Sequence, residues 1–144
     1  MAKKRKKTIL LIVVGVLWAL GITAWYLLVP GVPFLLAYLD KNIDETAFSI
    51  QELTINEGDR SIPAKIYVPK NASARKIILI HGVHYNGIKE ERLIDLAKIL
   101  AQNGHMVFTP EIDDLKRYNI VERSMDDMEI AANWFLEKSG KVEP

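Results

Sequence analysis

The residues best suited to chemistry lie in one short loop, residues 81–87 (HGVHYNG). The loop follows residues 77–80, a continuous apolar run that is typical of a strand buried on both faces. Ligands usually bind beyond the carboxyl ends of parallel strands, so a binding crevice is expected here. Gly82 would let the backbone turn sharply, so that the amides of Val83 and His84 point at one spot. Convergent amides of this kind are what an oxyanion hole requires.

Other polar residues have weaker functional interpretations. His81 and His84 form an H-x-x-H pair, but a zinc site needs a third ligand and no acid has a suitable spacing, so no metal is predicted. Candidates for facing a substrate are Tyr85, Arg117 and Tyr118, and packing is the favoured role of the last two. Four acids are interpreted as solvated or helix-capping residues: Asp113, Asp114, Asp126 and Asp127.

The segment before the loop has the pattern of an antiparallel hairpin. Residues 48–55 are typical of a strand, and residues 56–59 (NEGD) carry turn chemistry. Apolar side chains then alternate with others up to Pro69, at Ile62, Ala64, Ile66 and Val68.

Helical spacing dominates after the loop. A helix is predicted over residues 88–102, followed by a strand over 105–110 and a helix over 125–138 that closes at Gly140. Ser124 and Asp127 resemble a capping box for this last helix. The predicted buried stripes are Leu93, Leu96, Ala97 and Leu100 on the first helix and Met128, Ala131, Ala132 and Phe135 on the second. The order hairpin, strand, helix, strand, helix predicts an α/β fold with right-handed crossovers.

Charge divides the chain into two unlike parts. The 144 residues include 19 Lys and Arg against 18 Asp and Glu, and five of the basic residues lie within residues 3–7. Beyond residue 7, 14 bases face 18 acids, so nucleic-acid binding is disfavoured. The absence of cysteine excludes disulfides, thiol nucleophiles and thiolate zinc sites.

A membrane anchor is predicted at the amino terminus. Residues 8–29 are 22 consecutive uncharged residues, which as a helix would span about 33 Å. A cleaved signal peptide and a buried soluble helix are the alternatives. The basic cluster predicts a single pass through the cell (inner or plasma) membrane, with residues 1–7 in the cytoplasm and the rest exported. Residues 30–44 would form a juxtamembrane linker, in which residues 34–39 lie at the bilayer interface, and residues 45–144 the exported domain.

The chain also resembles a known superfamily. Residues 77–84 (IILIHGVH) are similar to the strand and oxyanion loop of α/β-hydrolase-fold proteins. Over about residues 62–144 the spacing of further positions is similar to a bacterial subgroup related to dienelactone-hydrolase and esterase-like proteins. These positions include Gly87-Ile88, Glu91-Arg92-Leu93, Thr109-Pro110-Glu111 and Arg117-Tyr118.

The resemblance implies a partial α/β-hydrolase sheet, truncated before the nucleophile elbow. Its strand order would be 1-2-4-3, which puts residues 77–80 at an edge. The Val83 amide, alone or with that of His84, would be half of an oxyanion hole in the loop that His81 and Gly82 begin. The family's G-x-S-x-G motif, acid and histidine would follow residue 138, and none of the five serines lies in such a motif.

The functional expectation is therefore the amino-terminal part of a membrane-anchored serine esterase-like hydrolase, inactive as this chain. The lipid bilayer is the predicted partner, and a small ester substrate is expected only if the missing half is supplied; no cofactor is predicted. The alternative is a non-catalytic, membrane-tethered interaction module that presents residues 83–87 or the sheet edge to a partner.

Overall fold

The computed structural model describes residues 14–24, 36, 38–71 and 75–141. The chain divides into two compact units, Met1–Leu36 and Ala37–Pro144. In the first unit residues 14–24 are helical, and most of their large apolar side chains are exposed. Within the described residues, no helix is both long and apolar enough to cross a membrane. The predicted basic tail and both ends of the predicted span (residues 8–13 and 25–29) lie outside the described residues.

The second unit begins with the predicted hairpin. After a short 3-10 helix (η1, Glu45–Ala47), strands β1 (Phe48–Glu57) and β2 (Arg60–Pro69) pair antiparallel along their whole length. Because Glu57 pairs with Arg60, the turn contains only Gly58 and Asp59, and β1 is two residues longer than predicted. Gly58 has φ +62°, as the first central position of a type II′ turn requires.

The sheet has four strands in the order β1-β2-β4-β3, which confirms the expected order and places β3 at an edge of the described sheet. Strand β4 (His105–Pro110) pairs antiparallel with β2 and parallel with β3 (Arg75–Ile78). The strand predicted over residues 77–80 thus lies two residues earlier in the structure, at Arg75–Ile78. The Leu79 amide still donates to the Phe108 carbonyl at 2.8 Å, after which the chain leaves the ladder.

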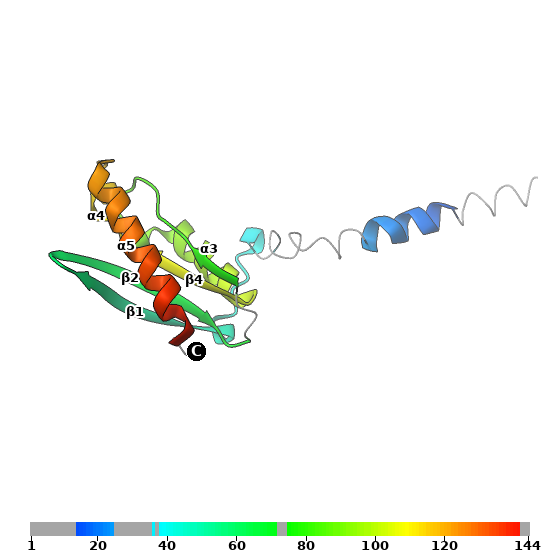
Figure 1. Ribbon diagram of the computed structural model, residues 1–144. Coiled ribbons are helices and arrows are strands. Elements are labelled where there is room, and N and C mark those ends of the chain that lie inside the picture. Colours follow the sequence, from blue (N-terminus) through cyan, green and yellow to red (C-terminus); the bar gives the residue numbers. More distant parts are fainter. Residues whose placement is uncertain (1–13, 25–35, 37, 72–74, 142–144) are drawn as a thin grey trace, which may run out of the picture. The chain divides into compact units, whose positions relative to one another are not determined.

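Helices α3 (Glu91–Gln102) and α5 (Glu122–Lys138) cover opposite faces of the sheet (Figure 1). Successive strand residues point to opposite faces, so each helix meets alternate residues of β2 and β4. On the α5 side of the sheet, the alternating apolar residues predicted for β2 pack with residues of β4 and α5. The β2 residues are Ile62, Ala64, Ile66 and Val68, and the others are Met106, Phe108, Ala131 and Phe135. Toward α3 it joins Phe48, Tyr67, Val107, Ala97 and Ala101.

The first long helix begins three residues later than predicted. Gly87, with φ +54°, starts a 3-10 turn (η2, Gly87–Lys89), and Glu90 is extended. The Glu90 carboxylate accepts a hydrogen bond from the Leu93 amide at 2.8 Å, so Glu90 caps α3. Of the predicted stripe only Ala97 is fully buried; the three leucines are half-buried.

The last helix begins three residues earlier than predicted, and a short helix precedes it. Helix α4 (Asp113–Lys116) occupies a segment for which no helix was predicted. The predicted capping box of α5 is wrong, because Ser124 is its third residue and accepts a hydrogen bond from the Val121 amide at 3.4 Å. Asp127 instead pairs with Arg60. A 3-10 turn, η3 (Ser139–Lys141), follows α5.

Candidate functional site

The loop after β3 is attached to the loop after β4 through one histidine. The ring of His81 is buried, and its Nε2 accepts a hydrogen bond from the Ile112 amide at 3.0 Å. Because an amide can only donate, Nε2 is unprotonated and the proton of the neutral ring is on Nδ1. Nδ1 lies 2.8 Å from the Gly82 carbonyl and donates to it. Both ring nitrogens therefore hold the start of the loop in place.

The residues after His81 offer free backbone N–H groups. Gly82 and Val83 are exposed, and within the described residues no acceptor meets the amide of Val83 or His84. The role expected for Gly82 is corrected: its φ is outside the left-handed region, and an added Cβ would meet no atom within 4 Å. The structure therefore gives neither a conformational nor a steric reason for a glycine at position 82.

The rest of the loop is held by local contacts. His84 stacks on Tyr85 with ring centroids 4.6 Å apart, and its Nδ1 accepts a hydrogen bond from the Asn86 amide at 3.2 Å. The Gly87 amide donates to the His84 carbonyl at 3.0 Å. Tyr85 is exposed. The described residues contain no group of three or more His, Asp or Glu side chains that could hold a metal ion.

An open groove of about 450 Å³ lies along the loop. Its apolar lining comes from Leu79 and Ile80 just after β3, from α3 and from Tyr38, and residues 81–84 line it as well. Arg92 donates a hydrogen bond to Glu90 that holds the pKa of this carboxyl below its usual range. Glu90 is therefore ionised at neutral pH and is not a proton donor there. The lining residues are Tyr38, Leu79, Ile80, His81, Gly82, Val83, His84, Glu90, Arg92, Leu93 and Leu96.

This arrangement offers two kinds of contact to a small molecule. Free backbone N–H groups can bind a carbonyl oxygen or the oxyanion formed from it. The apolar wall can bury a hydrocarbon chain. None of the described residues that line the groove is a serine, a threonine or a cysteine.

The structure separates Arg117 from this groove. Arg117 pairs with Asp113 at 2.8 Å and with Asp114 at 3.0 Å, and it helps to line a second, charged cavity. Tyr118 is exposed and has φ +60°. Of the sequence-predicted site residues, the structure thus brings His81, Gly82, Val83 and His84 together along one groove.

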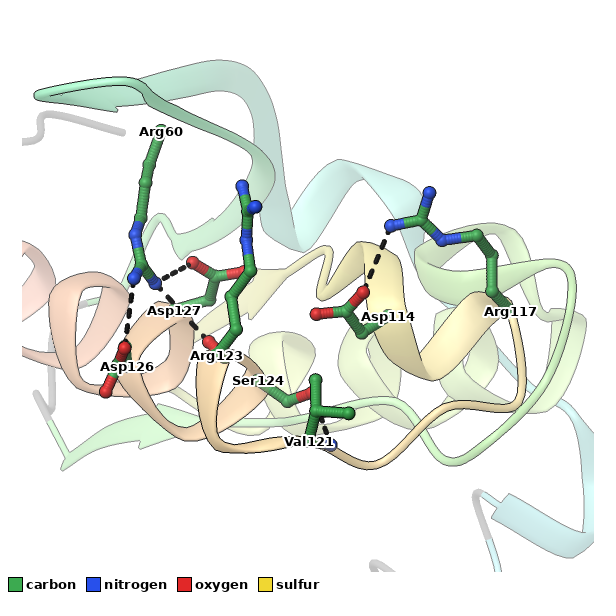
Figure 2. Close-up of polar contacts among 8 residues, drawn as sticks. All are labelled: Arg60, Asp114, Arg117, Val121, Arg123, Ser124, Asp126 and Asp127. Carbon is green, nitrogen blue, oxygen red and sulfur yellow. Dashed lines mark hydrogen bonds and ion pairs between the residues drawn. The ribbon is translucent and has the colours of Figure 1, made fainter.

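The second cavity contains residues that sequence analysis missed or assigned to other roles. Arg60 at the start of β2 donates to Asp127 at 2.6 Å and to Asp126 at 2.9 Å, as Figure 2 shows. These bonds raise the pKa of the Arg60 guanidinium. The solvated or capping role expected for Asp114 and Asp127 is wrong, because both are only 7% exposed and both pair with arginines. No local pattern could have revealed a pair that lies 67 residues apart.

Comparison with known proteins gives the fold. No family model and no curated protein matches the chain. An esterase described as cold-adapted, from an Arctic intertidal metagenomic library, superposes with a TM-score of 0.51 and 16% identity over 67% of this chain and 48% of that chain. A protein assigned as a dienelactone hydrolase from Klebsiella pneumoniae has a TM-score of 0.47 and 23% identity, over 63% of this chain and 45% of that chain.

The described residues therefore form an α/β fold whose four-stranded mixed sheet resembles part of an α/β hydrolase. The chain spans about half the length of the solved structures that it matches. At these identities the likeness concerns the fold alone.

Proposed function

We propose that this chain supplies the amino-terminal, oxyanion-binding half of a membrane-anchored α/β hydrolase that acts on acyl esters. The observation that carries the proposal is the position of the Val83 and His84 amides. These amides have no acceptor among the described residues, and Val83 and His84 help to line a mainly apolar groove just beyond the carboxyl end of a parallel strand. The resemblance of the fold to an esterase supports the same reaction class.

In the complete enzyme, a serine would attack the ester carbonyl and a histidine would accept the serine proton. The carbonyl oxygen would gain negative charge and bind the Val83 amide, while the acyl chain lies against Leu79, Leu93 and Leu96. The proposal assigns the nucleophile, the base and the acid of the triad to polypeptide outside this sequence. We accordingly expect no turnover from this chain alone.

The first test is to read the DNA beyond the codon for Pro144. We expect it to encode, in some frame or in an adjacent gene, a strand followed by G-x-S-x-G. An intact stop codon followed by unrelated sequence would contradict the proposal. Turnover of activated esters by the purified chain alone, abolished by a serine-directed phosphonate, would contradict it as well, because it would require an unrecognised nucleophile.

The second test uses the chain joined to, or co-expressed with, that downstream half. Val83→Pro deletes one amide donor, and Val83→Ala is the matched control that retains it. Loss of one oxyanion donor is expected to lower kcat about 10²–10³-fold in Val83→Pro. Equal activity in the two variants would show that the Val83 amide has no role in stabilising the oxyanion.

The membrane anchor is part of the same proposal. It is supported by the basic residues 3–7, by the uncharged run of residues 8–29 and by the exposed apolar side chains of residues 14–24. We propose an amino terminus in the cytoplasm and a second unit outside the cell membrane. Protease added to intact spheroplasts should digest the second unit. Full protection would contradict the orientation, and recovery of the protein in the soluble fraction would contradict the anchor.

A second candidate function has an observation of its own. Strand β3 is an edge of the described sheet, and residues 77–80 are half-buried beside the open groove. A non-catalytic module could use this edge to pair with an extended apolar segment of a partner protein. If this is the function, Ile80→Lys should abolish complex formation in cross-linked membranes, and the DNA beyond Pro144 should lack the nucleophile motif.

A further inference from the structure

The groove along residues 81–84 has one lining residue from the segment that enters the second unit. Tyr38 lines this groove together with Leu93 and Leu96 of α3. In the sequence, Tyr38 stands nine residues after residue 29, where the predicted membrane span ends. Nine residues reach at most about 32 Å when fully extended. In an anchored chain the groove therefore lies close to the end of the span.

Residues 38–45 are fastened to α3, so Tyr38 does not belong to a loose tether (Figure 1). The Lys41 ammonium lies 3.1 Å from the Asp95 carboxylate. The Gln102 side chain makes two hydrogen bonds to the backbone of the same segment, of 2.9 and 3.1 Å. Ile43 packs against the core between α3 and the sheet. These contacts extend over two turns of α3 and fix the entering chain beside the groove.

The charges in the lining of the groove neutralise each other. Of the described residues that line it, Glu90 is the only acid and Arg92 is the only lysine or arginine. Arg92 Nε lies 2.6 Å from the Glu90 carboxylate, and the Arg92 side chain is 78% exposed. A charged acyl group would therefore lose its hydration without gaining a free partner charge, whereas a hydrocarbon chain needs none.

Large apolar side chains next to the lining residues remain exposed. Leu39, which follows Tyr38, is 66% exposed, and Tyr85, which follows His84, is 65% exposed. Val83 is itself a lining residue and is 40% exposed. Leucine and tyrosine side chains of this kind are typical of surfaces that enter the headgroup region of a bilayer.

The length of the apolar wall bears on where a ligand comes from. The wall includes Leu79 after β3 and Leu93 and Leu96 on α3. Each CH₂ group of a chain favours an apolar phase over water about fourfold. A chain long enough to cover this wall is therefore concentrated in the bilayer and scarce in solution. A groove held close to the membrane meets such chains there.

We propose that the groove takes an acyl chain of a bilayer lipid, so that a membrane lipid ester, and not a small water-soluble ester, is the substrate of the complete enzyme. The inference rests on the proposed hydrolase function and its anchor, and it names the substrate class. The ester carbonyl would lie at the Val83 amide and the chain along Leu93 and Leu96, with Tyr38 as a further wall.

The test is photo-crosslinking of the full chain in vesicles of phosphatidylcholine and diacylglycerol. A small fraction of the phosphatidylcholine carries a diazirine near the end of one acyl chain, and mass spectrometry locates the adducts after illumination. We expect adducts in residues 79–84 and 91–96. Tyr38→Ala should lower them about tenfold. Leu39→Ala is the matched control, because Leu39 is a neighbouring exposed apolar residue outside the lining, and it should leave them unchanged.

Leu93→Gln places a polar amide in the wall and should lower the same adducts, and a circular dichroism spectrum shows whether this variant is folded. Tyr38→Ala decides the outcome even if Leu93→Gln unfolds. The inference is overturned if the adducts are confined to residues before Tyr38, or if Tyr38→Ala and Leu39→Ala lower them equally. Labelling of the groove from water by a short diazirine methyl ester, as strong as that by the lipid, overturns it as well.

This labelling requires no turnover, so the inference and the proposed function can fail separately. If the adducts form as expected but the DNA beyond Pro144 lacks the nucleophile motif, the hydrolase proposal fails and the groove is a lipid-binding site. If the complete enzyme cleaves p-nitrophenyl acetate but neither lipid ester of the vesicles, the hydrolase proposal stands and the lipid substrate is overturned.

Discussion

His81 Nε2 accepts a hydrogen bond from the Ile112 amide at 3.0 Å, and this bond joins the loops that follow the two parallel strands. The residues are 31 positions apart in sequence, and the contact is buried. It fixes the tautomer of the ring and the direction in which the chain leaves β3. The position of the Val83 amide therefore depends on His81. Both ring nitrogens of His81 are used within the protein, so neither is free to bind a ligand.

The first prediction follows from this bond. His81→Ala should lower the free energy of unfolding by about 2–3 kcal/mol, because it leaves the buried Ile112 amide without an acceptor and opens a cavity. The measurement is urea unfolding of the full chain in detergent, followed by near-UV circular dichroism. His84→Ala is the control, and because His84 is only half-buried its effect should be below about 1 kcal/mol. Equal losses in the two variants would contradict a special role for the His81–Ile112 bond.

The second prediction compares the two acids that share Arg60. The Asp127 side chain is 11% exposed and that of Asp126 is 51% exposed, although both hold the same guanidinium. Asp127→Asn should therefore cost about 2 kcal/mol of stability, while Asp126→Asn should cost well under 1 kcal/mol. The same urea titration measures both. An Asp126→Asn variant as unstable as Asp127→Asn would mean that exposure does not decide the strength of these pairs.

Local patterns predicted the hairpin well. The alternation from Ile62 to Val68 and the turn residues around Gly58 are sufficient to predict the two strands and their turn. Both signals depend only on residues that are neighbours in sequence. The helix ends were less predictable. Ser124 is a favoured capping type, yet it is the third residue of α5. Glu90 caps α3, although the helix was predicted to begin two residues earlier, at residue 88. Which side chain caps a helix depends on where the preceding chain arrives, and this is set by tertiary contacts.

The candidate site was predictable only in part. A buried strand followed by His81-Gly82 indicates a loop with free amides, because strand and loop are contiguous in sequence. The charged cavity had no such signal. Arg60 and Asp127 come from the hairpin and the last helix, and only the packing of α5 on the sheet brings them together. The acids of that cavity resemble ordinary surface residues until their burial is known.

The third prediction concerns alkaline pH. Burial, with a smaller contribution from the charge of Glu52, raises the pKa of Tyr67 to about 12, against about 10 in an unfolded chain. Between these values the unfolded chain releases the phenol proton and the folded chain retains it, so stability falls as pH rises. Below pH 10 the contribution is constant. Over the whole interval the loss attributable to Tyr67 is about 2–3 kcal/mol.

Tyr67→Phe isolates this effect, because the other tyrosines and the lysines titrate equally in both proteins. The difference in unfolding free energy between the two proteins should be constant up to about pH 10 and should then shift in favour of Phe. The measurement is urea unfolding at pH 9, 10, 11 and 12. A difference that stays constant to pH 12 would mean that the phenol ionises as readily in the folded as in the unfolded state.

The last prediction concerns Tyr118, which adopts φ +60° directly after α4. The Tyr118 amide donates to the Leu115 carbonyl at 3.2 Å and the Asn119 amide to the Asp114 carbonyl at 2.9 Å, which is the Schellman pattern of a helix end. Glycine is the usual residue at this left-handed position, because a Cβ is strained there. Tyr118→Gly should therefore be more stable than Tyr118→Ala by about 1 kcal/mol in urea unfolding, since both variants lose the ring and only alanine keeps the strained Cβ. Equal stability of the two variants would show that this turn relaxes without cost, and the positive φ of Tyr118 would then not be required by the fold.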